Sequence, residues 1–308
     1  MISTSKILII GSTNTDMVIR TDRFPKPGET ILGTEFFMNQ GGKGANQAVA
    51  AARLGGKVTF VSCVGDDLFG KNAVQSLVQE GVDVTYMQVD PNAPSGVAVI
   101  TVDSVGENHI VVAPGANATF VPEDAKAVPS LMDTDTVLLL QLEIPIPTVQ
   151  YLVTEAMQKN TRVVLNPAPA QQLSEELLRN IFILTPNEEE ASLLTGIEVR
   201  DENSAMAAAK MLKEKGVRNI IITMGAKGAV ALYDDEFFCV KAKEVLAVDT
   251  TAAGDVFNGA LVVAIQEGKS ILEAMEFASC AAAIAVTRLG AQSSSPYRQE
   301  LETSFQKI

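Results

Sequence analysis

The stretch "DTTAAGDVFNGAL", residues 249–261, joins a run of small residues to a segment apolar enough to be a buried helix. If the helix begins within residues 252–255, its first amide groups have no partner inside the helix and point outward together. The small side chains before Asp255 would let a phosphate approach these amides, which predicts an anion site. Asp255 would repel a resting phosphate, so we expect it to face an incoming hydroxyl and accept its proton.

A purely structural interpretation of this stretch is also open. Asp255 can cap a helix while its small neighbours allow close packing, and an isolated A-A-G-D motif favours this interpretation. A helix start changes the energy of a carboxylate by only ~0.3–1 kcal/mol, so we expect Asp255 to stay ionised at neutral pH. A weak base suffices for phosphoryl transfer, because the transition state is loose and catalysis comes mainly from alignment and charge neutralisation.

Short apolar runs alternate with helical spacings along most of the chain. The runs are "KILII" from Lys6, "KVTFVSCV" from Lys57, "TVLLLQL" from Thr136, "RVVLN" from Arg162, "IFILT" from Ile181 and "RNIIIT" from Arg218. They are apolar on both faces, as strands of a parallel sheet covered by helices should be. Spacings of i, i+3, i+4 and i+7 lie between them, and Ser270 with Glu273 predicts the start of a long helix ending near Gly290. We therefore expect an α/β fold with a doubly wound, mostly parallel sheet flanked by helices.

Two segments break this alternation, at about 14–41 and 95–117. They lack helical periodicity and offer extended stretches separated by turn residues. We interpret them as a small β-sheet that projects from the main body and serves as a lid, as a dimer contact, or as both. The whole chain, residues 1–308, is expected to be a single domain with this lid.

The composition excludes several partners. The formal charge is −13 and no block of Lys and Arg occurs, so we expect neither nucleic acid nor a membrane as a partner. The apolar runs fall far below the ~20 residues that span a bilayer and no signal peptide is apparent, which predicts a cytoplasmic protein. Cys63, Cys239 and Cys280 are too far apart for a disulfide framework or a zinc site and are interpreted as core or near-core thiols. His109, the only histidine, is assigned no chemistry.

Common nucleotide fingerprints are absent. No G-x-G-x-x-G follows the first strand, and "GGKG" at 41–44 lacks the spacing and the Ser or Thr of a P-loop. The H-R-D and D-F-G motifs of protein kinases are missing as well. Dinucleotide enzymes and P-loop enzymes are therefore disfavoured.

Several motifs in a fixed order resemble the ribokinase, or PfkB, family of carbohydrate kinases. They cover the chain from about Lys6 to Pro296, and two long motifs at the correct separation are much more specific than either alone. The motifs are "GSTNTD" at 11–16, "GGKGANQAVAAARLG" at 41–55, "GDD" at 65–67, "LNPAPA" at 165–170, "TPNEEE" at 185–190 and "DTTAAGDVFNGAL" at 249–261.

The resemblance implies a sugar site between the sheet edge and the lid. Donors and acceptors in pairs suit a polyol, since each hydroxyl both gives and takes a hydrogen bond. Taken singly, Asp16 could be a turn residue, Lys43 a solvated charge and Glu143 a surface acid. The matching sugar-binding positions are Asn14, Asp16, Gly42, Lys43, Asn46, Glu143 and Asp255.

The resemblance also implies ATP, Mg²⁺ and K⁺. Asn187 and Glu190 match an N-x-x-E motif that positions magnesium and the phosphates, although Glu188 to Glu190 could simply be acids in a helix's first turn. Nucleotide-binding positions match Asn187, Glu190, Thr223, Gly225, Gly228, Gly254 and Ser279; relatives often carry Asn or His at the last of these. A monovalent cation beside the anion site matches Asp249, Thr251, Ala285, Arg288, Gly290 and Ser294.

The implied activity is ATP-dependent phosphorylation of D-ribose at O5, giving ribose 5-phosphate and ADP. Asp255 would be the base, and the amides of Ala252, Ala253, Gly254 and Asp255 would hold the transferred group. Another kinase of the same family, acting on deoxyribose, fructose or a nucleoside, stays open. A sugar sensor without activity would be expected to have lost Asp255 or the glycines, and an NAD enzyme lacks its fingerprint. A homodimer through the lid is also expected.

Overall fold

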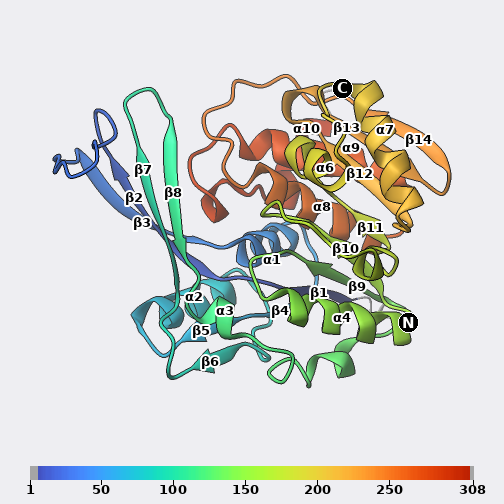
Figure 1. Ribbon diagram of the computed structural model, residues 1–308, viewed down its shortest axis with the longest axis horizontal. Helices are drawn as coiled ribbons and strands as arrows, with labels where there is room; N and C mark the ends of the chain where they lie inside the picture. The colour runs from blue at the N-terminus through green and yellow to red at the C-terminus, as the bar shows by residue number, and fades with distance from the viewer. Residues whose placement is uncertain (1–5, 306–308) are drawn as a thin grey trace.

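An eight-stranded sheet forms the centre of the molecule, which this computed structural model describes over residues 6–305 (Figure 1). Its strands are β1 (Lys6–Ile10), β4 (Val58–Val61), β9 (Thr136–Leu140), β10 (Arg162–Leu165), β11 (Ile183–Leu184), β12 (Asn219–Thr223), β13 (Ala229–Tyr233) and β14 (Glu236–Val240). Their order across the sheet is β14-β13-β12-β11-β10-β9-β1-β4. The six strands from β12 to β4 are parallel, and β13 and β14 add an antiparallel hairpin at one edge.

Alternate residues of the central strands enter two separate cores. Ile7 and Ile9 point into one core and Leu8 and Ile10 into the other, so β1 is apolar at nearly every position. The predicted mostly parallel sheet is therefore confirmed. The segment from Lys57 is divided between β4 and a short strand β5 (Cys63–Gly65), which pairs with β6 (Gln88–Asp90) in a separate two-stranded sheet.

Helices cover both faces of the main sheet, as expected for a doubly wound fold. One core is shared with α1 (Lys43–Arg53), α8 (Ala253–Gln266), α9 (Ile271–Ala285) and α10 (Arg298–Phe305). The other is shared with α4 (Ile146–Gln158), α5 (Glu175–Leu178), α6 (Glu188–Thr195) and α7 (Glu202–Glu214). Beside β5 lie α2 (Leu68–Gln79) and α3 (Ala116–Thr119), and three short 3₁₀ helices are η1 (Val128–Leu131), η2 (Gly225–Lys227) and η3 (Gln292–Ser294).

The long helix α9 begins with the predicted capping box, in which Ser270 and Glu273 bond to each other's backbone amides. It ends at Ala285, earlier than the predicted end near Gly290. The carbonyl of Val286 accepts the amides of Val248 and Asp249 from the neighbouring chain segment, at 2.7 and 3.2 Å. The Gly290 amide donates to the Asp249 side chain instead of continuing the helix.

A second, four-stranded sheet projects from the main body (Figure 1). Its order is β3-β2-β7-β8, with β2 (Asn14–Arg20), β3 (Glu35–Gly41), β7 (Gly96–Val102) and β8 (Asn108–Ala113). These strands lie within the two segments that were expected to form a small separate sheet. The register places Asp16 beside Asn39 and Ala98 on one face of this sheet.

The chain order places polar segments at one edge of the main sheet. β1 lies between β4 and β9, so the direction in which successive strands are added reverses at β1. In open parallel sheets, ligands bind outside the carboxyl ends of the strands at such a reversal point. The segments that follow β1, β9, β10 and β11 therefore converge with the start of α8.

Two other sequence expectations can be compared with the structure. Cys63 and Cys280 are buried as expected, but Cys239 is exposed, because it lies on the edge strand β14. Within residues 6–305, no helix combines the length and the hydropathy needed to cross a bilayer. The predicted domain range also includes residues 1–5 and 306–308, which lie outside the described residues.

Candidate active site

Helix α8 starts with a backbone turn that exposes amide groups. Ala252 precedes the helix in the left-handed region, at φ 59° and ψ 11°, which is uncommon for a residue with a side chain. The Ala253 amide donates to the carbonyl of Thr250 at 3.2 Å, so it is engaged inside the protein. The amides of Ala252, Gly254 and Asp255 make no hydrogen bond to any described residue. Three of the four amides expected to hold a phosphate are thus available.

Asp255 lies in the first turn of α8 and is almost fully buried, at 6% exposure. Asn46 Nδ2 donates to its Oδ2 and Gln47 Nε2 donates to its Oδ1, each at 2.9 Å. Burial raises the pKa of the Asp255 carboxyl, while the charge of Lys43 and the two amide donors act to lower it. The expectation that Asp255 stays ionised at neutral pH considered the helix start and not this burial, and it stays a prediction.

Two further carboxylates lie near Asp255. Burial, together with the charges of Glu143 and Asp255, raises the pKa of Asp16 to about 7. Glu143 Oε2 accepts the Ser12 hydroxyl at 2.5 Å and the Lys43 amide at 3.0 Å. Burial alone would lower the pKa of the Lys43 amine, but the surrounding carboxylates, Asp255 first among them, raise it. The side chains of Asp16, Lys43 and Glu143 therefore interact with one another and with Asp255. The interpretations of each as a separate turn or surface residue do not hold.

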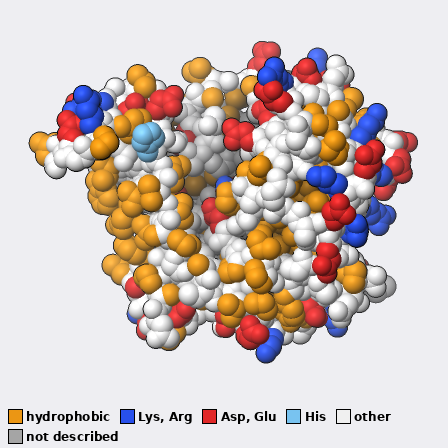
Figure 2. Space-filling view, viewed as in Figure 1, with side chains coloured by type: hydrophobic (Ala, Val, Ile, Leu, Met, Phe, Trp, Pro, Cys, Tyr) orange, Lys and Arg blue, Asp and Glu red, His pale blue; other side chains and the backbone are white. Residues whose placement is uncertain are grey.

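The remaining predicted sugar-binding residues lie at the same edge. Asn14 is buried, and its Oδ1 accepts Asn117 Nδ2 at 2.9 Å. Gly42 precedes α1 at φ 88°, and a Cβ there would lie 2.8 Å from the Asn14 amide, so both its conformation and its space require glycine. Asn46 is buried, and its Oδ1 has no partner. Figure 2 shows a hollow between the second sheet and the main body, with acidic side chains inside it.

A polar pocket of about 170 Å³ lies between Lys43 and the start of α8. Asn187 and Glu190 line it from the start of α6, where each side chain bonds the other's backbone amide in a capping box, at 2.8 and 2.9 Å. Burial raises the pKa of Glu190 to about 7, although the Asn187 amide and the Lys43 charge oppose the shift. Asn187 and Glu190 thus line the polar pocket and also form the start of a helix, as the alternative interpretation allowed.

A second pocket of about 430 Å³ opens on the other side of Gly254. The predicted nucleotide positions Thr223, Gly225, Gly228 and Ser279 all line it, and Gly254 lines both pockets. A Cβ built on Gly254 would meet no atom within 4 Å, so it would project into open space, and because Gly254 lines both pockets we expect the passage between them to lie there.

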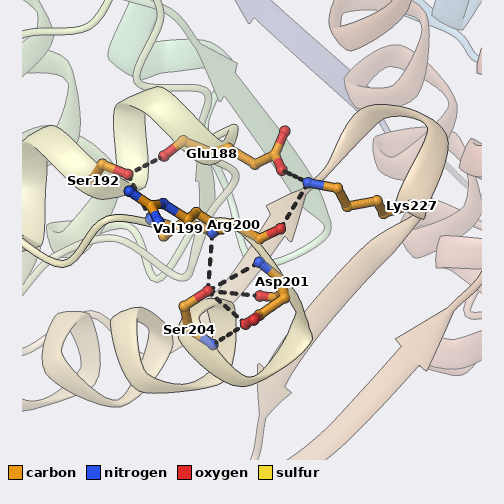
Figure 3. A network of polar contacts seen from close by, with 7 residues as sticks. All are labelled: Glu188, Ser192, Val199, Arg200, Asp201, Ser204 and Lys227. Carbon is orange, nitrogen blue, oxygen red and sulfur yellow. Dashed lines mark hydrogen bonds and ion pairs between the residues drawn. The ribbon is translucent and has the colours of Figure 1, made fainter.

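The loop of η2, at the wall of this second pocket, is held against α6. The Thr223 amide donates to the Pro186 carbonyl at 3.0 Å. Lys227 Nζ donates to Glu188 Oε1 at 2.8 Å and to the Arg200 carbonyl at 2.7 Å, as Figure 3 shows. The two segments predicted to contact the nucleotide are therefore fixed relative to each other.

The positions predicted for a monovalent cation lie in two adjoining loops. Asp249 joins these loops, since its Oδ1 accepts the Thr251 amide and its Oδ2 accepts the Gly290 amide, both at 2.9 Å. The Ala285 carbonyl accepts the Arg288 amide at 3.0 Å, and the Arg288 side chain pairs with Glu300. Ser294 is buried nearby in η3. No group of three or more His, Cys, Asp or Glu suited to a metal occurs within the described part of the chain.

Sequence reasoning missed a set of buried polar residues behind Asp255. Gln47 and Gln141 have no exposed surface, and Asn166, Thr185 and Asn258 are almost as fully buried. Thr185 Oγ1 donates to Asn258 Oδ1 at 2.6 Å, and Asn258 Nδ2 donates to the Gly254 carbonyl at 2.8 Å. A signal existed for Gln47, because "ANQAVAAA" is otherwise a run of small and apolar residues, and a lone amide pair there needs polar partners.

Comparison with known proteins agrees with this geometry. The chain is 47% identical to the ribokinase of Haemophilus influenzae over 294 residues, which cover 96% of both chains. It is 39% identical to the deoxyribokinase of Salmonella typhi over 291 residues, 94% of this chain and 95% of that one. The solved structure of Arabidopsis thaliana ribokinase complexed with ribose and ATP matches with a TM-score of 0.90 and 32% identity, covering 97% of this chain and 98% of that chain. The profile described as pfkB family carbohydrate kinase matches residues 4–298, and the chain belongs to this family.

Proposed function

We propose that this protein transfers the γ-phosphoryl group of ATP to O5 of D-ribose, giving ribose 5-phosphate and ADP. The observation that carries the proposal is that Gly254 lines both a polar pocket and a larger, mostly apolar one, while the adjacent Asp255 lines the polar pocket. A phosphoryl group in transit between two bound substrates needs such a junction, with free amides and one base.

The chemical step follows from this junction. The O5 hydroxyl gives its proton to Asp255 while O5 forms a bond to the γ-phosphorus. The bond from that phosphorus to the β,γ-bridging oxygen breaks, and ADP leaves with its electron pair. The free amides of Ala252, Gly254 and Asp255 stabilise the charge on the transferred group, and Lys43 adds a positive charge beside it.

The residues present fit Mg²⁺ on the phosphate side of the polar pocket. Glu190 is a buried carboxylate that lines this pocket, and a cation would offset the cost of keeping it ionised there. Glu190 and Asn187 would position the ion. Magnesium neutralises the charge of the phosphates when it is bound.

We assign the monovalent cation to the two loops that the Asp249 carboxylate joins through the amides of Thr251 and Gly290. Asp249, Thr251, Ala285, Arg288, Gly290 and Ser294 are the positions we propose to surround it. Its bound charge would order the loop of residues 251–255. Replacing potassium with sodium or with a larger counterion should then change the rate.

Ribose is proposed over related acceptors because the residues proposed to bind the sugar are paired donors and acceptors, and the chain has no Trp and only four Tyr to stack on a nucleobase. Deoxyribose is the second candidate, supported by the similarity to a deoxyribokinase. The test measures kcat/KM for ribose, 2-deoxyribose, fructose and a nucleoside with ATP. A higher value for any acceptor other than ribose would reassign the substrate, and ³¹P–¹H coupling to the C5 protons of the product would identify O5.

We also propose that the second sheet is a lid and that two copies of the chain associate through its outer face. Met38, Val99 and Val111 are neighbours across that face and are 54%, 44% and 71% exposed. Figure 2 shows apolar side chains gathered on the flank of the projecting sheet. Self-association of this face would cover them in a two-fold interface. Sedimentation at micromolar concentration should show a dimer, and Val111→Lys should give a monomer; a monomeric wild type would refute the dimer.

A cytoplasmic location completes the proposal. The three cysteines of the sequence are unpaired in the structure, and Cys239 is exposed, which fits a reducing compartment.

A further inference from the structure

We propose that Gln47 is a positioning residue that fixes one oxygen of Asp255, so that the other oxygen is left to accept the proton of the sugar hydroxyl. The inference rests on the proposed kinase function and assigns different roles to the two carboxylate oxygens. It is carried by a chain of buried amides that runs from the end of β11 to α8. Gln47 and Gln141 line neither pocket, whereas Asn166 and Thr185 also line the polar one.

The orientation of every amide in this chain follows from its acceptors. The Thr185 carbonyl can only accept, so Asn166 must present Nδ2 to it, at 3.2 Å. Asn166 therefore presents Oδ1 to Gln47, whose Nε2 lies 3.1 Å away. The same Nε2 donates to Asp255 Oδ1 at 2.9 Å, and an ionised carboxylate can only accept as well. Two independent acceptors thus require the same orientation of Gln47.

The other end of Gln47 is fixed by Gln141. Gln141 Nε2 donates to Gln47 Oε1 at 2.6 Å, and neither side chain has exposed surface. Gln141 Oε1 is left buried without a partner, which is the cost of this arrangement. A rotation of Gln47 would break three hydrogen bonds, so its bond to Asp255 Oδ1 is retained throughout the reaction.

Asn46, which donates to Asp255 Oδ2, differs from Gln47 in one respect. Its own Oδ1 is buried and has no partner, whereas Gln47 Oε1 is bonded. A sugar hydroxyl can supply the missing donor to Asn46 and can approach Oδ2 from the same side. Oδ1 is then the oxygen held by the protein, and Oδ2 is the oxygen offered to the substrate.

The charged groups that face Asp255 come from four other elements or segments. Lys43 on α1 favours its ionised form, while Asp16 on β2, Glu143 after β9 and Glu190 on α6 oppose it. A donor such as Gln47 also favours the ionised form, so its removal should make Asp255 a base only at higher pH. This consequence separates a positioning role from a purely structural one.

The experiment replaces Gln47 by Met, which keeps the length of the side chain and removes the donor. The expected result is a displacement of the acidic limb of the kcat/KM profile by about one pH unit upward and a fall in kcat of about 10-fold at pH 7, with KM for ribose within about 2-fold. Asn46→Leu should also shift the acidic limb upward, because Asn46 donates to Asp255 Oδ2, but it should in addition raise KM for ribose, because it removes a group proposed to contact the sugar.

Gln266→Met is the matched control. Gln266 lies on α8, at the end opposite to Asp255 and about 16 Å from it. Its side chain donates to the Asp135 carbonyl at 3.0 Å, and its Oε1 has no partner. Its replacement should leave the pH profile in place. An unshifted profile in Gln47→Met, or an equal shift in Gln266→Met, would overturn the inference.

A second measurement does not depend on turnover. The loss of stability as pH rises from about 4 should be larger in Gln47→Met than in wild type, because a raised folded-state pKa of Asp255 means that stability is lost as pH rises through it. Equal losses would overturn the inference even if the protein phosphorylated no sugar. Absence of activity in wild type with every acceptor would instead refute the proposed function.

Discussion

The pocket beside Asp255 is lined by side chains that hold one another through hydrogen bonds, whereas the pocket beyond Gly254 is lined mainly by glycine, alanine and backbone. Asn46 and Gln47, which lie behind the first pocket, hold the Asp255 carboxylate in one orientation through their hydrogen bonds. In the second, Gly225, Ala282 and Ala283 contribute shape and little hydrogen bonding. The two pockets meet at Gly254 but are built by different means.

This difference indicates which changes each pocket tolerates. A site made of paired polar side chains depends on the chemical identity of each, because the loss of one leaves its buried partners without a bond. A site made of small residues and backbone depends on the space they leave. Changes of identity should therefore be severe on the Asp255 side, and changes of size should matter at Gly254 and beyond.

The largest effect is expected for Asp255→Asn. The amide keeps the size of the side chain but cannot take up the proton of the sugar hydroxyl, so kcat should fall about 10³-fold while the fold is retained. Steady-state rates with ribose and ATP would measure this, with circular dichroism to check folding. Asp22→Asn, on an exposed turn, is the control and should be unchanged. Near-normal turnover of Asp255→Asn would refute its assignment as the base.

Gly254→Ala should be next in effect and tests the contribution of space. The added Cβ meets no protein atom within 4 Å, and alanine is a better helix former than glycine, so the midpoint of thermal unfolding should be unchanged or higher. The methyl group would occupy the passage between the pockets, and kcat/KM for ATP should fall by about 10- to 100-fold. Gly254→Val should lower kcat/KM for ATP further.

Gly268→Ala, in the open turn after α8, offers a comparison for the glycine change. Its φ of 75° makes alanine unfavourable there, so it should lower stability and leave kcat/KM alone. If Gly254→Ala instead lost stability and kept its rate, the passage between the pockets would have no role in catalysis.

The same contrast explains how far the sequence could predict the structure. The A-A-G-D stretch, the apolar strands and the Ser270 capping box are local signals, and each predicted its element. The hairpin β13–β14 was not expected, and its outer strand β14 is partly exposed, with Glu236 and Cys239 at the surface. Its sequence therefore lacks the continuous apolar run of a doubly covered strand.

Part of the site could not be predicted because it is formed by contacts between segments that are distant in the sequence. Gln47 bonds residues that are 94, 119 and 208 positions away, and no spacing along the chain signals such partners. The effect of burial on the pKa of Asp255 was left out for the same reason, since this burial depends on how α1 packs on α8. The positive φ of Ala252 could not be predicted either, because alanine as a residue type does not indicate this backbone conformation.

Asp16→Asn should combine a functional loss with a gain in stability. Burial and the nearby carboxylates raise the folded-state pKa of Asp16 to about 7, so its contribution to stability is lost as pH rises from about 4 through 7. Asparagine avoids this loss, and the midpoint of thermal unfolding at pH 8 should rise by about 2 °C or more without ribose. KM for ribose should rise about 10-fold. A fall in stability at pH 8 would contradict the assigned cause of the raised pKa.

The smallest effect is expected for Ser279→Ala. Ser279 contributes a single hydroxyl to a pocket whose neighbouring lining residues are Ala282 and Ala283 on α9 and Val286 directly after it, so a purine there is held mainly by apolar contact. Removing the hydroxyl changes neither the shape nor the apolar area of the wall, and kcat/KM for ATP should fall by less than about 3-fold. Ala283→Leu adds a larger side chain to the same wall. It should lower kcat/KM for ATP more than Ser279→Ala does, since it takes space from the base. If the serine change were instead the more severe of the two, the second pocket would depend on hydrogen bonding after all, and the contrast between the two sides of Gly254 would not hold.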